Sequence, residues 1–135
     1  PEIGTIVAQE KPIVILTSNN TREISDALKR RCLHLYIPFP DAALEQRIIE
    51  SRVPELGIQL REQLVDFIQQ IRQRDLKKLP AVSETIDWAR TLLLLHADTL
   101  DRDIVRNTLN VILKFQDDIE NIEAELPALM AKKRP

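Results

Sequence analysis

Two neighbouring amides, Asn19 and Asn20, are the first residues of this chain whose position suggests chemistry. They follow the uninterrupted apolar run 13–16, which is rich in β-branched residues and predicts a strand buried on both faces. In open α/β sheets, ligands bind beyond the carboxyl ends of the strands. A neutral amide at such a strand end can hold a water molecule without competing for its proton, although the same residues also suit an ordinary loop.

Three consecutive cations, Lys29, Arg30 and Arg31, form the second group that could act on a ligand. They end the segment 21–31, which we predict to be a helix that Thr21 can cap. A planar guanidinium suits phosphate oxygens better than an ammonium does, so an arginine here could contact a phosphoryl group. Cations at a helix C-terminus also complement the helix dipole, and they commonly do nothing more.

The stretch TSNN, followed by a short helix ending in RRC and a second predicted strand at 32–37, resembles the sensor-1 and arginine-finger region of AAA+ ATPases. It is most similar to the MoxR family, in particular its CoxD-like branch, over roughly the first forty residues. The resemblance implies that Asn19 is the sensor-1 residue, with Asn20 as the fallback. It also implies that Arg31 is the arginine finger, with Arg30 as the fallback, and reaches the nucleotide of a neighbouring subunit.

The family also implies a third contact, sensor 2, which is an arginine at the start of the third lid helix. The corresponding segment here reads KKLPAVSET and contains no arginine. Lys78, or its neighbour Lys77, could substitute as a point charge and bind the nucleotide cofactor. The alternative is a pair of solvated lysines.

The expected fold is mainly α, with short β-strands from the end of an AAA+ α/β core followed by a four-helix lid. Residues 1–38 would be the core remnant and residues 39–135 the lid, with Pro38-Phe39-Pro40 as the hinge. We predict lid helices at about 41–53, 60–74, 81–97 and 102–125, the last breaking or bending near Asp117 and ended or kinked by Pro127. In the first of them, Leu44, Ile48 and Ile49 are expected to face inward, with Val53 as a further candidate.

A phosphate-binding loop of the form G-x-x-x-x-G-K-[ST] is missing, because the only glycines are Gly4 and Gly57. The chain is therefore expected to be the C-terminal part of a longer ATPase. ATP and magnesium would bind the full-length parent and would not bind this part tightly. The 135 residues alone are expected to be inactive, and no metal ligands are expected among them.

Composition excludes several other classes of function. The net charge is −2 and the charges are interspersed, which argues against nucleic acid as a partner. Neither a signal peptide nor an apolar run near the ~18 residues of a membrane span occurs, so no membrane contact is expected. One cysteine forms no internal disulfide and fits a reducing, cytoplasmic setting.

The resemblance implies partners as well. A MoxR-type ATPase would self-associate into a ring, expected to be a hexamer. It would act in a chaperone-like way, remodelling client proteins or maturing their metal centres, and the client often carries a von Willebrand factor A domain. Two alternatives stay open. One is a clamp-loader-like AAA+ subunit, because RRC also resembles that arginine-finger motif, and the other is a non-enzymatic helical adaptor that binds protein.

Overall fold

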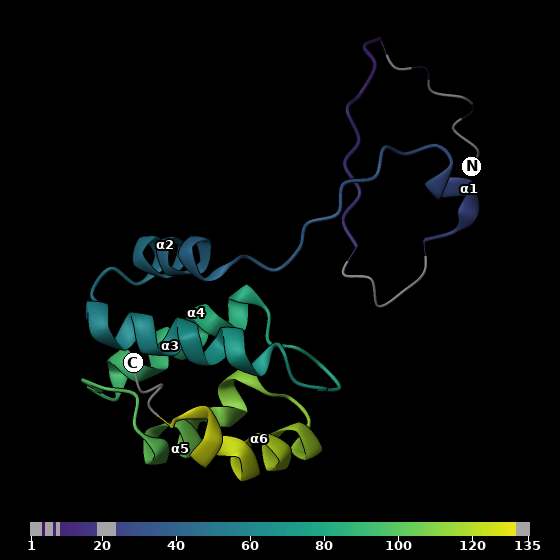
Figure 1. The fold of residues 1–135 in the computed structure, drawn as a ribbon. Helices are drawn as coiled ribbons and strands as arrows, with labels where there is room; N and C mark the ends of the chain where they lie inside the picture. The colour runs from purple at the N-terminus through teal and green to yellow at the C-terminus, as the bar shows by residue number, and fades with distance from the viewer. Residues whose placement is uncertain (1–3, 5–6, 8, 19–23, 132–135) are drawn as a thin grey trace. The chain divides into compact units, whose positions relative to one another are not determined.

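The computed structural model of the chain describes residues 4, 7, 9–18 and 24–131. These residues are mainly helical (Figure 1). The chain separates into two units, Pro1–Ile37 and Pro38–Pro135.

The described part of the first unit is an extended chain with one short helix, α1 (Asp26–Lys29). Ser25 caps this helix by accepting a hydrogen bond from the amide of Leu28 at 3.4 Å. The predicted strands at 12–16 and 32–37 do not form in this structure, and both segments are exposed to solvent. A strand is stable only when a neighbour pairs with its backbone, and the described residues of this unit supply no such neighbour. The predicted helix 21–31 is also shorter here.

The second unit begins with three helices that match the predicted ones to within a few residues. They are α2 (Ala42–Arg52), α3 (Ile58–Ile71) and α4 (Val82–Leu94). Asp41 caps α2 by accepting a hydrogen bond from the Leu44 amide at 2.8 Å. An aspartate in this position satisfies one of the amides that a helix start leaves without a partner.

The predicted helix 102–125 is instead two helices, α5 (Arg102–Ile112) and α6 (Gln116–Leu129). The break lies at Leu113–Phe115, where both end residues have extended backbone angles. Leu113 is buried, so the turn keeps its side chain in the core while the chain changes direction. Pro127 lies inside α6 and does not end it. Within its described residues, the second unit therefore has five helices, not the four expected.

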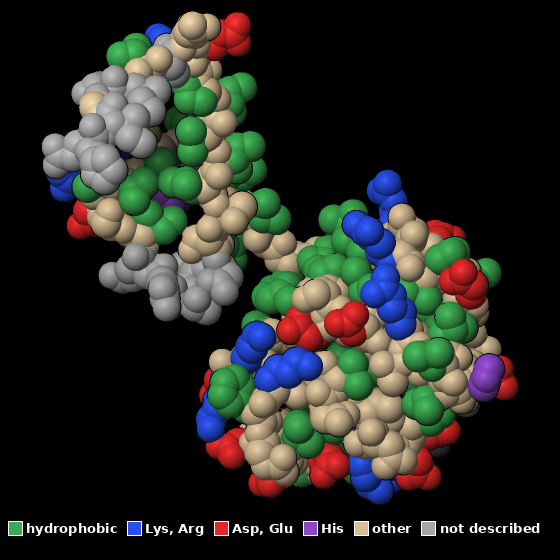
Figure 2. Space-filling view, turned by 180° about the vertical axis from the view of Figure 1, so that it is seen from behind, with side chains coloured by type: hydrophobic (Ala, Val, Ile, Leu, Met, Phe, Trp, Pro, Cys, Tyr) green, Lys and Arg blue, Asp and Glu red, His purple; other side chains and the backbone are tan. Residues whose placement is uncertain are grey.

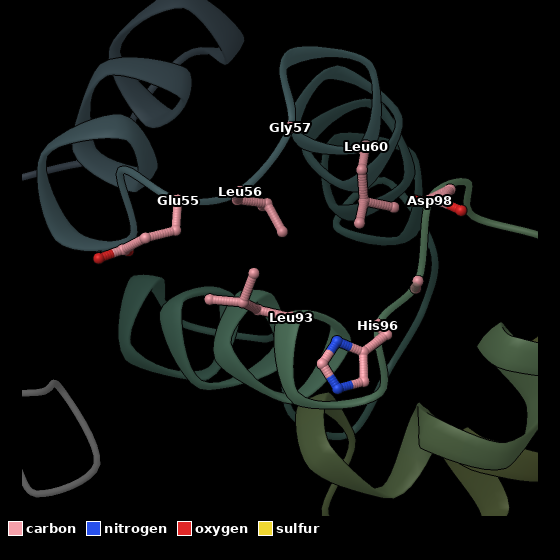
Figure 3. A pocket seen from close by; sticks show the side chains of 8 residues that line it. Glu55, Leu56, Gly57, Leu60, Leu93, His96 and Asp98 are labelled. Atoms are coloured by element: carbon pink, nitrogen blue, oxygen red, sulfur yellow. The ribbon is translucent and has the colours of Figure 1, made fainter.

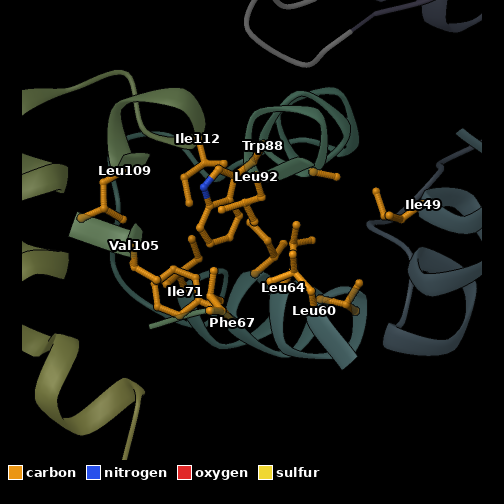
Figure 4. Packing of buried hydrophobic residues seen from close by; sticks show 14 of the residues in the cluster. Ile49, Leu60, Leu64, Phe67, Ile71, Trp88, Leu92, Val105, Leu109 and Ile112 are labelled. Carbon is orange, nitrogen blue, oxygen red and sulfur yellow. The ribbon is translucent and has the colours of Figure 1, made fainter. Parts of the chain in front are cut away.

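The core of the second unit is built on Trp88, whose side chain is completely buried (Figure 4). The Phe67 ring tilts against it, with the ring centroids 5.5 Å apart. The Trp88 indole nitrogen donates a 2.8 Å hydrogen bond to the buried hydroxyl of Thr108. Helix α4 packs against α2, α3 and α5, and α6 packs against α3 and α5. One cluster thus joins all five helices.

The charges on the second unit are mixed in sign. Figure 2 shows lysine, arginine, aspartate and glutamate side chains interspersed over the visible face of this unit. Among the residues described, no helix is long and apolar enough to cross a bilayer.

Candidate functional site

Arg31, the predicted arginine finger, lies in the turn that follows α1 and is exposed. Its Nη1 donates a 2.9 Å hydrogen bond to the carbonyl of Ala27, one turn back. No carboxylate of the described residues pairs with it, so most of its donors face solvent. Arg30, the fallback, is exposed as well. Asn19 and Asn20, the predicted sensor-1 positions, lie outside the described residues.

Lys77 and Lys78 lie in the loop between α3 and α4, and Asp118 fixes the backbone of this loop. The buried carboxylate of Asp118 accepts hydrogen bonds from the Lys77 amide at 3.0 Å and from the Lys78 amide at 3.3 Å. Asp118 itself lies in the first turn of α6, where a negative charge is favoured by the helix dipole. The loop is therefore anchored to a helix far away in the sequence.

The side chain of Lys77 is committed to a partner. Its ammonium pairs with the Asp117 carboxylate and lies 5.9 Å from the centre of the Phe115 ring. The hydrogen bond and charge of Asp117 raise the pKa of Lys77, and the same two contacts lower the pKa of Asp117. Lys77 is thus the more closely paired of the two lysines.

Lys78, the sensor-2 candidate, is in a longer ion pair, and its exposure is close to the 56% of the Lys77 side chain. Its side chain is 53% exposed, and its ammonium lies 3.5 Å from the Glu84 carboxylate. Glu84 also accepts hydrogen bonds from the Ala81 amide at 3.1 Å and the Ser83 hydroxyl at 2.9 Å. Burial raises the pKa of Glu84, but the Ser83 hydrogen bond, a backbone hydrogen bond, and the charge and hydrogen bond of Lys78 together outweigh it and lower the pKa overall. Lys78 therefore lies in the loop before α4, beside a carboxylate that stays ionised.

A buried polar cluster close to this loop was not predicted from the sequence. The Glu45 side chain on α2 is completely buried and meets Arg72, which follows α3, through two hydrogen bonds of 2.7 and 2.8 Å. The Thr85 hydroxyl on α4 donates to the same carboxylate at 3.0 Å, and the Gln69 amide donates to it at 2.7 Å. A bidentate pair with further donors satisfies the buried charge. One sequence signal could have indicated that Glu45 is buried. It lies four residues before Ile49 and eight before Val53, so it falls on the same buried face of the helix.

The same cluster also fixes Phe39 and Pro40, the segment by which the chain enters the second unit. The Gln69 amide donates a second hydrogen bond, of 3.0 Å, to the carbonyl of Pro40. The Arg72 guanidinium lies 4.7 Å from the centre of the Phe39 ring, in cation–π contact. Two adjacent residues at the predicted hinge are thus fixed to α3 and its end.

A shallow pocket of about 350 Å³ lies elsewhere, where the α2–α3 turn meets the end of α4. Figure 3 shows Leu56 and Leu93 pointing toward one another across it. His96, at its rim, is the only described non-glycine residue with a positive φ, at 52°. The described residues contain no group of side chains suited to hold a metal ion.

Comparison with known proteins adds no relative: no family model, curated protein or solved structure matches the chain. Arg31 lies in the first unit and Lys78 in the second.

Proposed function

We propose that this chain is the C-terminal part of a MoxR-type AAA+ ATPase, which couples ATP binding and hydrolysis to remodelling or metal-centre maturation of a client protein. The observation that carries the proposal is the stretch TSNN followed by a short helix and RRC. The exposed guanidinium of Arg31, just past the end of α1, supports it.

In this proposal Asn19 aligns the attacking water and Arg31 reaches the nucleotide of the neighbouring subunit. An arginine supplied in trans offsets the charge that develops on the transferred phosphoryl group, an effect of roughly 10³–10⁵ in rate. Lys78 contributes a weaker contact to the phosphates from the loop before α4. The short strands, 12–16 and 32–37, would form by pairing with the remainder of the core sheet, and the helical unit would be the lid.

Several further features follow from the proposal. ATP and magnesium would be bound by the part of the parent that carries the phosphate loop, and the chain by itself would be inactive. The parent would work in the cytoplasm as a ring, expected to be a hexamer, on a client that often has a von Willebrand factor A domain. The mixed surface charge argues against nucleic acid as a partner and, with it, against a clamp-loader-like subunit.

The test uses the complete reading frame that encodes this chain. We expect it to contain a phosphate loop and to hydrolyse ATP. Arg31→Ala should abolish turnover and leave ATP binding intact, whereas Lys29→Ala, which removes a nearby cation at the end of α1, should change neither. A reading frame without a phosphate loop would favour the adaptor, and full turnover by the Arg31 variant would remove this residue from the finger role.

A further inference from the structure

We propose that Arg72 and Gln69 are positioning residues that couple the entry segment, Phe39–Pro40, to the loop that carries Lys78. Both side chains contact the buried Glu45 carboxylate, and each also reaches backbone or ring atoms outside the helices. The coupling itself is independent of the proposed function. The role that we give to this coupling, which is to place Lys78, rests on the proposed function.

The entry side of the coupling depends on Gln69. Both N–H groups of its side-chain amide are used, one on the Pro40 carbonyl at 3.0 Å and one on Glu45 at 2.7 Å. Both partners are acceptors only, so the orientation of the amide is determined by them. Any displacement of the Pro40 carbonyl must therefore either break this bond or move Gln69 against the buried carboxylate.

The loop side of the coupling depends on Arg72. Its Nε donates a 2.9 Å hydrogen bond to the carbonyl of Pro80, a buried residue directly before the N-cap of α4. Its Nη2 lies 3.3 Å from the Thr85 hydroxyl in the first turns of the same helix. Lys78 precedes Pro80 by two residues, and its own amide is held by Asp118. The loop is consequently fixed at both ends of the segment 78–80.

The cluster is suited to transmit displacement because its members are rigid and close to saturated with hydrogen bonds. The guanidinium is fixed by hydrogen bonds to Glu45 and Pro80, while its central carbon lies 4.7 Å from the centre of the Phe39 ring. The Arg72 side chain is only 6% exposed, so water competes weakly for these contacts. A change in the path of residues 39 and 40 would thus be felt at Pro80, on the Lys78 side of the unit.

The test measures backbone order in the intact chain by ¹⁵N relaxation. Gln69→Leu should loosen the entry, so that the order parameters of the Phe39 and Asp41 amides fall from about 0.85 to below about 0.6, and it should also lower those of Leu79 and Ala81, because the cluster transmits the change. The pair Glu45→Met with Arg72→Met should loosen the entry and also Leu79 and Ala81. This pair removes both charges together, which avoids leaving one of them buried without a partner.

Two controls make the outcome specific. Gln70→Leu changes the neighbouring glutamine, which bonds to Asp66 on its own helix, and Arg74→Met removes an exposed ion pair with Glu125. Neither should alter the order parameters of Phe39, Asp41 or Ala81. Unchanged order at the entry in Gln69→Leu, or at Ala81 in either variant, would overturn the coupling.

The placement of Lys78 needs a separate readout. In the ATPase of the complete reading frame, the Glu45/Arg72 double variant should raise KM for ATP more than it lowers kcat. Loosened order parameters with unchanged KM would keep the coupling and remove its role in placing Lys78. A complete reading frame without ATPase activity would instead sink the proposed function and leave the relaxation result standing.

Discussion

The Glu45 carboxylate and the Arg72 guanidinium form two parallel hydrogen bonds, of 2.7 and 2.8 Å, and the side chains are 0% and 6% exposed. Removing one partner leaves the other charge buried without compensation, so Glu45→Ala should lower the free energy of unfolding by about 3–5 kcal/mol. Chemical denaturation followed by far-UV circular dichroism measures this. The double variant Glu45→Met/Arg72→Met should lose much less than the single one, and an equal loss would contradict this account.

Thr108 is the hydrogen-bond acceptor for the buried indole of Trp88, at 2.8 Å. Thr108→Val keeps the shape of the side chain and leaves the indole N–H without a partner. It should therefore cost about 1–3 kcal/mol of unfolding free energy. The control is Thr91→Val, because the Thr91 hydroxyl bonds only to a carbonyl of its own helix. Equal losses in the two variants would show that the Trp88 bond has no special weight.

His96 ends α4 in a left-handed conformation. The Ala97 amide donates to the Leu92 carbonyl at 3.1 Å and the His96 amide to the Leu93 carbonyl at 3.0 Å, which is the Schellman pattern that usually places glycine at this position. His96→Gly should raise the free energy of unfolding by about 0.5–1 kcal/mol. Ala97→Gly, at a residue without a positive φ, should lower it. A destabilised His96→Gly would mean that the imidazole makes a contact more valuable than the strain it causes.

The Lys77–Asp117 pair predicts a pH dependence with a definite sign. The pKa of Asp117 is lowered from 3.8, so its contribution is present above that value and is lost as pH falls through the folded pKa. The pKa of Lys77 is raised from 10.5, so its contribution is present below that value and is lost as pH rises further. The difference in unfolding free energy between the wild type and Lys77→Met should therefore be constant between pH 3.8 and pH 10.5. It should shrink toward zero below and above this range.

Because both side chains are exposed, this difference should be small and should shrink with added salt. Lys114→Met is the matched control, since the Lys114 ammonium bonds to the carbonyl of Val111 and not to a carboxylate. Its difference from the wild type should not vary with pH around 3.8.

Local signals in the sequence predict most of the helices. Asp41 and Asp101 each cap the helix that follows, because a cap depends only on residues within the next turn. The break between α5 and α6 was placed too late, near Asp117, because apolar residues continue at helical spacing through Leu113 and Phe115. Only the packing of Leu113 against the other helices decides that the chain turns there.

Features that depend on distant residues could not be predicted. The prediction that Leu44 faces inward was wrong: its side chain is 47% exposed, and Glu45 is buried in its place. An apolar side chain made Leu44 the better candidate for burial. The charge of Glu45 is instead satisfied by hydrogen bonds from Arg72 and Thr85, which lie at the end of α3 and on α4. The strand at 12–16 fails for a related reason, since its stability requires a paired neighbour that local sequence does not provide.

The position of Trp88 gives the molecule two separate optical reporters. The chain contains one tryptophan, sealed in the core of the helical unit, and one tyrosine, Tyr36, exposed in the first unit. Emission excited selectively in the indole therefore follows the melting of the helices alone, shifting to the red as water reaches the ring. A soluble quencher should reduce the fluorescence of Trp88 weakly and that of Tyr36 strongly. A loss of Tyr36 quenching would therefore show that another chain or segment has covered the extended residues around it.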